Sequence, residues 1–136
     1  MIPRGGYAAT TEVGELLFIS GQLAVTDGQL VASGIVGADI DLATAEACAR
    51  ACALNVLSQL EAATAAGSAL RIVKLTVFVA SSPDFIQQSR VADAASQLIN
   101  EAIGTTGGHS RSAIGVAALP LGSPVEVEAI AAITDR

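Results

Sequence analysis

The sequence predicts a single α+β domain in which two helices pack on one face of a mixed β-sheet. A chain of 136 residues is long enough for one hydrophobic core and too short for two ordinary domains, so residues 1–136 are expected to form one domain. The hydrophobic share of 51% supplies that core. Two segments with a helical period are separated and flanked by extended segments, and this order is typical of a sheet covered by helices.

The N-terminal part has the pattern of short strands. Extended runs on both sides of Gly14 predict a hairpin with its turn at that glycine. Such a hairpin places Tyr7 opposite Gly21 or Gln22. A second turn is predicted at residues 27–28, where the Asp-Gly pair is typical of tight turns.

Two segments carry hydrophobic residues at the spacing of an amphipathic helix. The first follows Asp41, a good N-cap, and is expected to end at Gly67. The second is expected to have Ser82 as its N-cap and Pro83 as its first helical residue. Its apolar stripe runs as far as Gly104, which predicts the end of the helix there.

The remaining segments are predicted strands. The stretch RIVKLTVFVA, at 71–80, is the clearest because its β-branched residues alternate onto one face. The last part of the chain has the pattern of a hairpin with its turn near Leu121 and Gly122. The predicted element order is therefore strands, helix, strand, helix and a final pair of strands.

Arg111, Glu126 and Glu128 are charged residues in this otherwise apolar final segment. In the predicted hairpin, Glu126 lies across from about Ala117, and Arg111 lies further along its strand by roughly 20 Å, at ~3.4 Å per residue. Arg111 and Glu126 of one chain should therefore not meet, and a site that used both would have to join two subunits. The alternative is that each is a separate surface charge at a strand end.

Cys48 and Cys52 are four residues apart in the first predicted helix, so they lie on one helix face. They form either a redox pair, half of a metal site completed by His109, or two small core residues. We favour the core residues, because cysteine is among the most buried residue types. No four-ligand spacing supports zinc, and no metal site is predicted.

Charge and hydropathy exclude several classes of protein. A net charge of −6 with only seven Lys and Arg argues against a nucleic-acid partner, which usually requires a basic face. No apolar stretch reaches the roughly 18 residues of a membrane span, so no membrane partner is expected. The start, MIPRGGYAAT, lacks the apolar region of a secretory signal, so a cytoplasmic location is the default expectation.

Four segments together resemble the RidA/YjgF family of small reactive-imine deaminases, in order and in spacing, between residues 7 and 133. They are SGQL at 20–23, VKLTVFVASSPDF at 73–85, SRSAIGVAALP at 110–120 and VEVEAIAAI at 125–133. Three stretches are most similar to a divergent subgroup of that family, whose activity is unsettled: ACALNVLSQL, VASSPDF and HSRSAIGVAALPLGSPVEVEAI.

The resemblance implies a homotrimer of chorismate-mutase-like fold, with three clefts between subunits. It implies that Arg111 holds a substrate carboxylate and that Glu126 positions the attacking water. Tyr7, Ser20 and Gly21 match further substrate-binding positions of the family. Glu128 matches no functional position, and neither a metal nor an organic cofactor is implied.

Three departures from the family pattern bear on the substrate. The usual Pro-Ala-Arg-Ser is His109-Ser110-Arg111-Ser112 here, the usual cysteine is Ala113, and the expected asparagine aligns with Ser89. Ala113 is still expected to contribute to the site through its backbone N–H. His109 is either a new acid or base or an ordinary loop histidine, and we favour the second.

The leading hypothesis is an enzyme that hydrolyses 2-imino acids and enamine acids, such as those derived from 2-aminoacrylate, to 2-oxo acids and ammonia. The alternative is a non-catalytic trimer that binds a small carboxylate and regulates a partner enzyme. Only the enzyme requires a water-orienting Glu126, so this residue discriminates between the two. An endoribonuclease or translation inhibitor is the third choice, because the chain is acidic and poor in aromatic residues that could stack on bases.

Overall fold

The computed structural model describes residues 3, 5–104 and 108–133. The described chain contains two α-helices, seven strands and one short 3-10 helix. In chain order these are β1 (Thr10–Val13), β2 (Leu16–Leu23), β3 (Val25–Thr26), β4 (Gln29–Leu30), α1 (Leu42–Ala63), β5 (Leu70–Ala80), α2 (Gln88–Ile103), β6 (Ser110–Val116), η1 (Pro120–Gly122) and β7 (Val125–Ile133).

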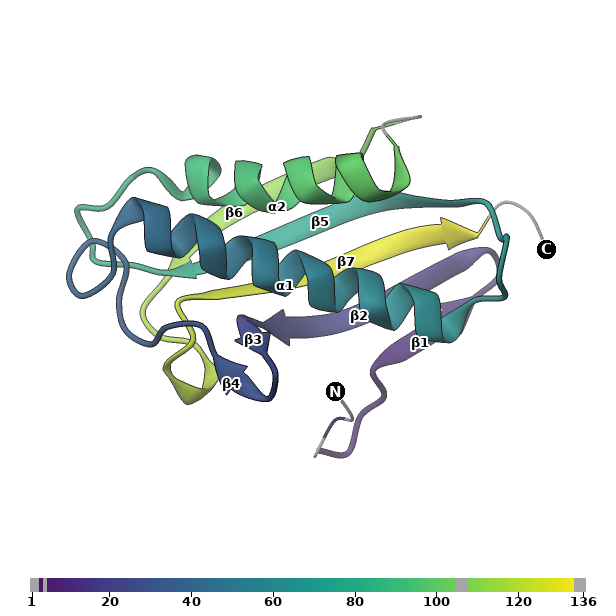
Figure 1. Ribbon diagram of the computed structural model, residues 1–136, viewed down its shortest axis with the longest axis horizontal. Coiled ribbons are helices and arrows are strands. Elements are labelled where there is room, and N and C mark those ends of the chain that lie inside the picture. Colours follow the sequence, from purple (N-terminus) through teal and green to yellow (C-terminus); the bar gives the residue numbers. More distant parts are fainter. Residues whose placement is uncertain (1–2, 4, 105–107, 134–136) are drawn as a thin grey trace.

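Five strands form one mixed sheet in the order β1-β2-β7-β5-β6. The pairing of β5 with β6 is parallel, and the other pairings in this sheet are antiparallel. Figure 1 shows that α1 and α2 lie side by side across the same face of the sheet. The predicted α+β class, with two helices on one face of a mixed sheet, is confirmed.

The first hairpin turns where the sequence predicts it. Val13 pairs with Leu16, and Gly14 has a φ of 61°, a left-handed conformation that glycine adopts without strain. The strand β1 begins only at Thr10, so Tyr7 precedes the ladder. Tyr7 therefore forms no ladder pair with Gly21 or Gln22, although all three residues line one hollow.

Two of the four predicted helix ends are correct. The Asp41 carboxylate accepts a hydrogen bond from the Thr44 N–H at 2.8 Å, which caps α1 and lowers the pKa of Asp41. Gly104 follows the last residue of α2 with a φ of 85°. Helix α1 stops before Gly67, at Ala63, because Thr64 is extended and its hydroxyl donates to the Leu60 carbonyl at 2.8 Å.

The second helix begins later than predicted, at Gln88 rather than Pro83. Ser82 does not cap it, because the Ser82 backbone N–H donates at 3.0 Å, and its hydroxyl at 3.5 Å, to the carbonyl of Val36. This contact ties the segment after β5 to the loop before α1. The N-terminal boundary of α2 is therefore decided by a contact that is distant in sequence.

The predicted hairpin between the last two strands is wrong. Strand β5 lies between β6 and β7, and the intervening segment 117–124 passes from one side of β5 to the other. Glu126 consequently pairs with Leu23 on β2 and with Phe78 on β5, not with Ala117. Strand β5 fits a central position because its residues Leu75, Val77 and Val79 are fully buried.

The core lies between the sheet and the helices, and both cysteines belong to it. Cys48 and Cys52 are free and fully buried, which confirms that they are core residues. Sγ of Cys52 donates to the Val125 carbonyl at 3.4 Å. Burial raises the pKa of both thiols, so they are poor nucleophiles. Across the described chain, no three His, Cys, Asp or Glu side chains gather as metal ligands.

The face of the sheet opposite the helices has no layer of secondary structure over it. Leu16, Phe18 and Ile114 are 38%, 41% and 42% exposed, and all three point to this open face. A shallow hollow of about 420 Å³ lies over the same face, lined by Phe18, Thr76 and Glu128 among others. We call this surface the open sheet face. Neither described helix is both long and apolar enough to cross a membrane.

Candidate functional site

Five of the residues singled out from the sequence line one hollow of about 490 Å³ beside β2. They are Tyr7, Ser20, Gly21, Glu126 and Glu128. Tyr7 comes from the segment before β1 and is 62% exposed, whereas Glu126 lies on β7 and is partly buried. Residues far apart in the sequence thus meet in one place, which we call the glutamate hollow.

A β-bulge shapes the wall of the glutamate hollow. The register between β2 and β7 shifts by one residue between Ile19 and Gln22, so that Ser20 and Gly21 together lie opposite the single residue Glu128. The Ser20 N–H donates to the Ala9 carbonyl at 2.9 Å, and the Ser20 hydroxyl donates to the Ala8 carbonyl at 2.7 Å. Bulges of this kind redirect side chains and are frequent beside functional sites.

Gly21 makes room for the Glu126 side chain. A Cβ atom at position 21 would lie 2.9 Å from Cδ of Glu126 and 3.2 Å from its Cγ. Real Cβ contacts are almost never this close to a neighbouring carboxylate. The glutamate therefore lies directly against the bare backbone of the bulge, and any larger residue would push it away.

The Glu126 carboxyl is less acidic than an ordinary glutamate. Burial raises its pKa, and the negative charge of Glu128 raises it further. Both glutamates point to the open sheet face, because Val125, Val127 and Ala129 alternate with them and are buried on the helix side. A carboxylate in this setting can accept a proton more readily than one in water.

Asn55 is a lining residue of the glutamate hollow that sequence reasoning missed. Its side-chain amide donates to the carbonyls of Leu23 at 3.0 Å and Val25 at 2.9 Å. Asn55 therefore ties α1 to the end of β2. The signal in the sequence is weak: one polar residue in an otherwise apolar stretch of helix.

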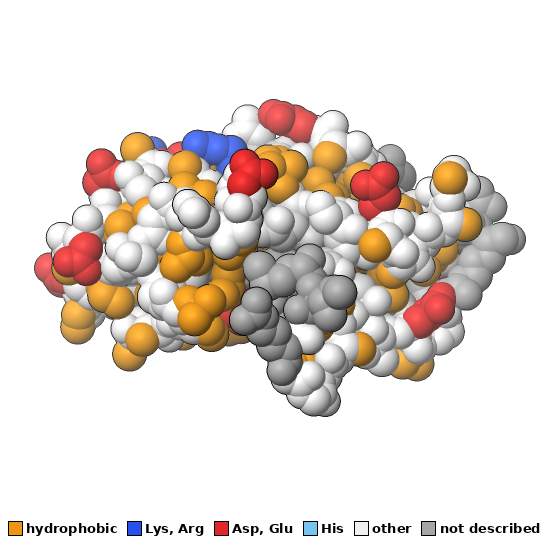
Figure 2. Space-filling view, turned by 60° about the horizontal axis from the view of Figure 1, so that its bottom comes forward, with side chains coloured by type: hydrophobic (Ala, Val, Ile, Leu, Met, Phe, Trp, Pro, Cys, Tyr) orange, Lys and Arg blue, Asp and Glu red, His pale blue; other side chains and the backbone are white. Residues whose placement is uncertain are grey.

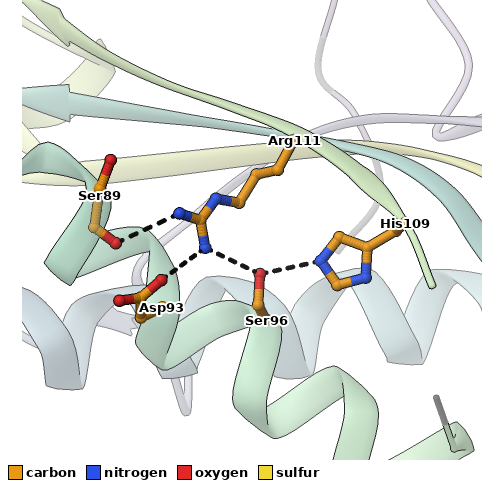
Figure 3. Close-up of polar contacts among 5 residues, drawn as sticks. All are labelled: Ser89, Asp93, Ser96, His109 and Arg111. Carbon is orange, nitrogen blue, oxygen red and sulfur yellow. Dashed lines mark hydrogen bonds and ion pairs between the residues drawn. The ribbon is translucent and has the colours of Figure 1, made fainter.

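Arg111 lies in a second polar cluster, on the helix side of the edge strand β6 (Figure 3). Its Nη1 donates to Oδ1 of Asp93 at 2.8 Å and to the Ser96 hydroxyl at 3.2 Å, and its Nη2 donates to the Ser89 carbonyl at 3.5 Å. The side chain is 23% exposed, so it is partly buried and still in contact with solvent. We call this group the arginine cluster.

His109 contacts the arginine cluster through the hydroxyl group of Ser96. Its Nε2 lies 2.9 Å from the hydroxyl of Ser96, which also accepts from Arg111. Burial lowers the pKa of His109, and the positive charge of Arg111 lowers it further. The imidazole is therefore neutral at neutral pH, and its place is next to the arginine rather than next to the cysteines.

Ala113 and Ser89 both lie near Arg111, but only Ser89 forms a hydrogen bond with it. Ala113 is on β6, two residues after Arg111, and packs against the core. Ser89, where the family pattern has an asparagine, contacts Arg111 through its backbone carbonyl. Asp93 and Ser96 follow on the same helix at positions i+4 and i+7, a spacing that could have revealed both.

Arg111 and Glu126 of one chain belong to opposite faces of the sheet. Arg111 is paired with Leu75, which is fully buried beneath the helices, and its polar partners are on α2. Glu126 points to the open sheet face, on the far side of β5. The separation inferred from the sequence is therefore real, although its cause is the sheet order and not a long hairpin.

The described residues that line the glutamate hollow include no Lys or Arg. On the face drawn in Figure 2, acidic side chains are spread over the surface, and the Lys and Arg side chains of the described residues show only along the upper edge. Hydrophobic side chains gather between them. The described side chains of this face therefore form no basic groove for a nucleic-acid backbone.

The fold and the two clusters define the class of protein: a small α+β domain that carries polar groups on opposite faces of one sheet. A family model described as Endoribonuclease L-PSP matches residues 1–133. The chain therefore belongs to this family, which is the YjgF/RidA family. The resemblance seen in the sequence is confirmed.

Several known proteins are similar to this chain over nearly its whole length. Protein TCP17 of Trypanosoma cruzi is 45% identical over 130 residues, which cover 94% of this chain and 81% of that protein. Atu1372 from Agrobacterium tumefaciens, a protein of unknown function, has a crystal structure with a TM-score of 0.90 and 41% identity. The match covers 97% of this chain and 85% of the Atu1372 chain. TdcF of E. coli, solved with bound serine, has a TM-score of 0.64 at 26% identity, with coverages of 98% and 92%.

Proposed function

We propose that this protein hydrolyses reactive 2-imino acids and their enamine tautomers to 2-oxo acids and ammonia, in the cytoplasm. The observation that carries the proposal is the chemistry of the two clusters. One holds an arginine whose side chain is partly exposed, and the other holds a partly buried glutamate against a bare backbone. A carboxylate grip and a water-orienting base are the two groups that this hydrolysis needs.

The arginine supplies the grip. A 2-imino acid carries a carboxylate beside an electrophilic C=N carbon, and the planar guanidinium can hold that carboxylate by two parallel hydrogen bonds. The bound serine of TdcF supports a ligand of this size, because serine is a small 2-amino acid. In this chain the same type of ligand would bind through Arg111.

The glutamate supplies the base. Glu126 orients a water molecule, accepts its proton as the oxygen attacks the C=N carbon, and returns a proton to the nitrogen. Loss of ammonia then leaves the 2-oxo acid, so that one imine and one water give one oxo acid and one ammonia. The raised pKa of Glu126 suits this exchange of protons near neutral pH. The step requires neither a metal nor an organic cofactor.

A homotrimer brings the two groups together. Arg111 and Glu126 of one chain are on opposite faces of the sheet, so a complete site takes its arginine from one subunit and its glutamate hollow from the next. The apolar side chains of the open sheet face supply the surface for such an assembly. The three resulting clefts lie between subunits.

The assembly is tested by sedimentation. We expect a single species of about three times 13.6 kDa at micromolar concentration, because association removes Leu16, Phe18 and Ile114 from water. Phe18→Glu places a charge in that face and should shift the protein toward the monomer. Ile86→Glu, at a residue that is 85% exposed in the loop between β5 and α2, is the matched control. A stable monomer of the parent protein would contradict the shared site.

The reaction is tested by generating imines in the assay mixture. An amino-acid oxidase or a serine/threonine dehydratase produces the unstable imine or enamine, and the appearance of the 2-oxo acid and of ammonia is followed with and without this protein. We expect the protein to accelerate both. A rate equal to that of spontaneous hydrolysis for every imine tested would remove the deaminase proposal.

Two other functions remain as alternatives. A non-catalytic trimer that binds a small carboxylate and regulates a partner enzyme is favoured by the departures at Ser89, His109 and Ala113. It predicts ligand binding without turnover. An endoribonuclease is suggested by the description of the family model. The net charge of −6 makes that activity the less favoured one.

A further inference from the structure

The arginine cluster leaves only one edge of the Arg111 guanidinium for a ligand. Both N–H groups of Nη1 are already used, one by the Asp93 carboxylate and one by the Ser96 hydroxyl. The Nη2 atom donates at 3.5 Å to the Ser89 carbonyl, on the same side as Asp93 (Figure 3). The end of the guanidinium is therefore closed by acceptors from α2.

The side edge is formed by Nε and the second N–H of Nη2. Within the described part of the chain, neither of these two N–H groups has a hydrogen-bond acceptor. This edge is itself a planar two-donor fork, which matches the spacing of the two oxygens of a carboxylate. A ligand can thus be held by two parallel hydrogen bonds while Asp93 stays in place.

We propose that Asp93 is a positioning residue that dictates which edge of Arg111 binds the carboxylate. The inference rests on the proposed function, in which Arg111 is the carboxylate-binding group. Asp93 acts in two ways: it holds Nη1 in place, and its negative charge excludes a second carboxylate from the end of the guanidinium. The ligand is left with one orientation, and its C=N carbon is delivered to one point in the cleft.

The geometry of α2 explains why these residues can perform this role. Ser89, Asp93 and Ser96 are at positions i, i+4 and i+7, so they form one row along the helix. The adjacent row, which includes Val91, Ala92 and Ala95, is fully buried and fixes the helix against the sheet. Acceptors on a rigid helix can position a guanidinium more accurately than acceptors on a loop.

A contribution to stability alone is a weak explanation for the ion pair. The Asp93 side chain is 68% exposed, and ion pairs in contact with water contribute little to the free energy of unfolding. The row of acceptors is directed at the two terminal nitrogens, Nη1 and Nη2, of the residue that binds the ligand. Orientation of the guanidinium is the effect that this arrangement produces.

The test separates binding from turnover in Asp93→Ala, with 2-oxobutanoate as the binding probe in calorimetry and in-situ imine hydrolysis as the activity. Without Asp93, the carboxylate of 2-oxobutanoate can also bind the end of the Arg111 guanidinium, and it is no longer repelled by a neighbouring negative charge. The affinity for 2-oxobutanoate should therefore be unchanged or several-fold higher. The kcat should fall about tenfold or more, because part of the ligand is bound in the wrong orientation. Asp93→Asn keeps an oxygen acceptor for Nη1 and should recover most of kcat.

Glu101→Ala is the matched control, because it removes an acidic residue from the same helix just over two turns away. It should leave both quantities unchanged. Equal losses of affinity and kcat in Asp93→Ala, or parent-like values of both, would overturn the positioning role. Trimer mass and thermal unfolding of each variant establish that it is folded.

Failure of the proposed function gives a different result. If Arg111→Ala binds 2-oxobutanoate as the parent does, Arg111 is not the carboxylate-binding group, and both proposals fall. If Arg111→Ala loses binding while Asp93→Ala keeps the affinity and the kcat of the parent, only the role of Asp93 is wrong.

Discussion

Arg111→Ala should lose imine hydrolysis almost completely while the trimer persists. Hydrogen bonds to charged groups contribute about 1.5–3 kcal/mol each, so the loss of two lowers kcat/KM by roughly 100-fold or more. Arg111→Lys keeps the positive charge but not the planar fork, and it should lose most of the activity as well. Steady-state kinetics on an imine generated in the assay measures both effects.

Arg90→Ala is the control for this result, because it removes an exposed arginine from the same helix that carries Asp93. Its kcat/KM should stay within a few-fold of the parent value. Undiminished hydrolysis by Arg111→Ala would mean that the carboxylate is held elsewhere, and the proposed mechanism would be wrong.

Glu126→Gln should lose turnover but keep ligand binding, whereas an Arg111 variant should lose ligand binding. The amide keeps the shape of the side chain but cannot accept the proton of the attacking water, so kcat should fall by roughly 100-fold or more. The affinity for 2-oxobutanoate should remain within a few-fold of the parent value. Calorimetry and steady-state kinetics on the same preparation test the two parts.

The pH dependence of turnover should follow from the raised pKa of Glu126. The ionised form is the active base, so kcat/KM should rise with pH through a midpoint above 4.5, the ordinary value for glutamate. Burial between subunits would raise the pKa of Glu126 further. The positive charge of an arginine from the next subunit would lower this pKa, but that charge is already partly balanced by Asp93.

Glu128→Gln is the control for Glu126, because it removes a neighbouring carboxylate on the same face. It should retain turnover, and its acid limb should move to lower pH, since the charge of Glu128 raises the pKa of Glu126. Full turnover by Glu126→Gln, or an acid limb of the parent at or below 4.5, would exclude Glu126 as the base.

The same shift has a consequence for stability. With its pKa raised by folding, Glu126 binds its proton more tightly in the folded chain than in the unfolded one. The free energy of unfolding therefore falls as pH rises from the unfolded pKa through the folded pKa. Glu126→Gln avoids this cost, so it should be at least as stable as the parent at neutral pH while turning over far less substrate.

Part of the candidate site could be predicted from the sequence, and part could not. The motifs around Ser20, Arg111 and Glu126 were sufficient to indicate the family and the expected roles of these residues. The local signals for Asp93, Ser96 and Asn55 are weak, and they do not show what these residues contact. No local signal indicates that Gly21 lies against Glu126. These contacts join residues from different elements, and their existence depends on how the elements pack.

The sequence by itself determined the family, the α+β class, the cap at Asp41, the turn at Gly14 and the burial of both cysteines. Each of these depends on signals contained in a few neighbouring residues or in a repeated period. Only the tertiary structure decided that β5 separates β6 from β7 and that Arg111 and Glu126 face opposite sides of the sheet. Strand neighbours are chosen by which surfaces can be buried together, and that choice is made between segments that the local pattern does not connect.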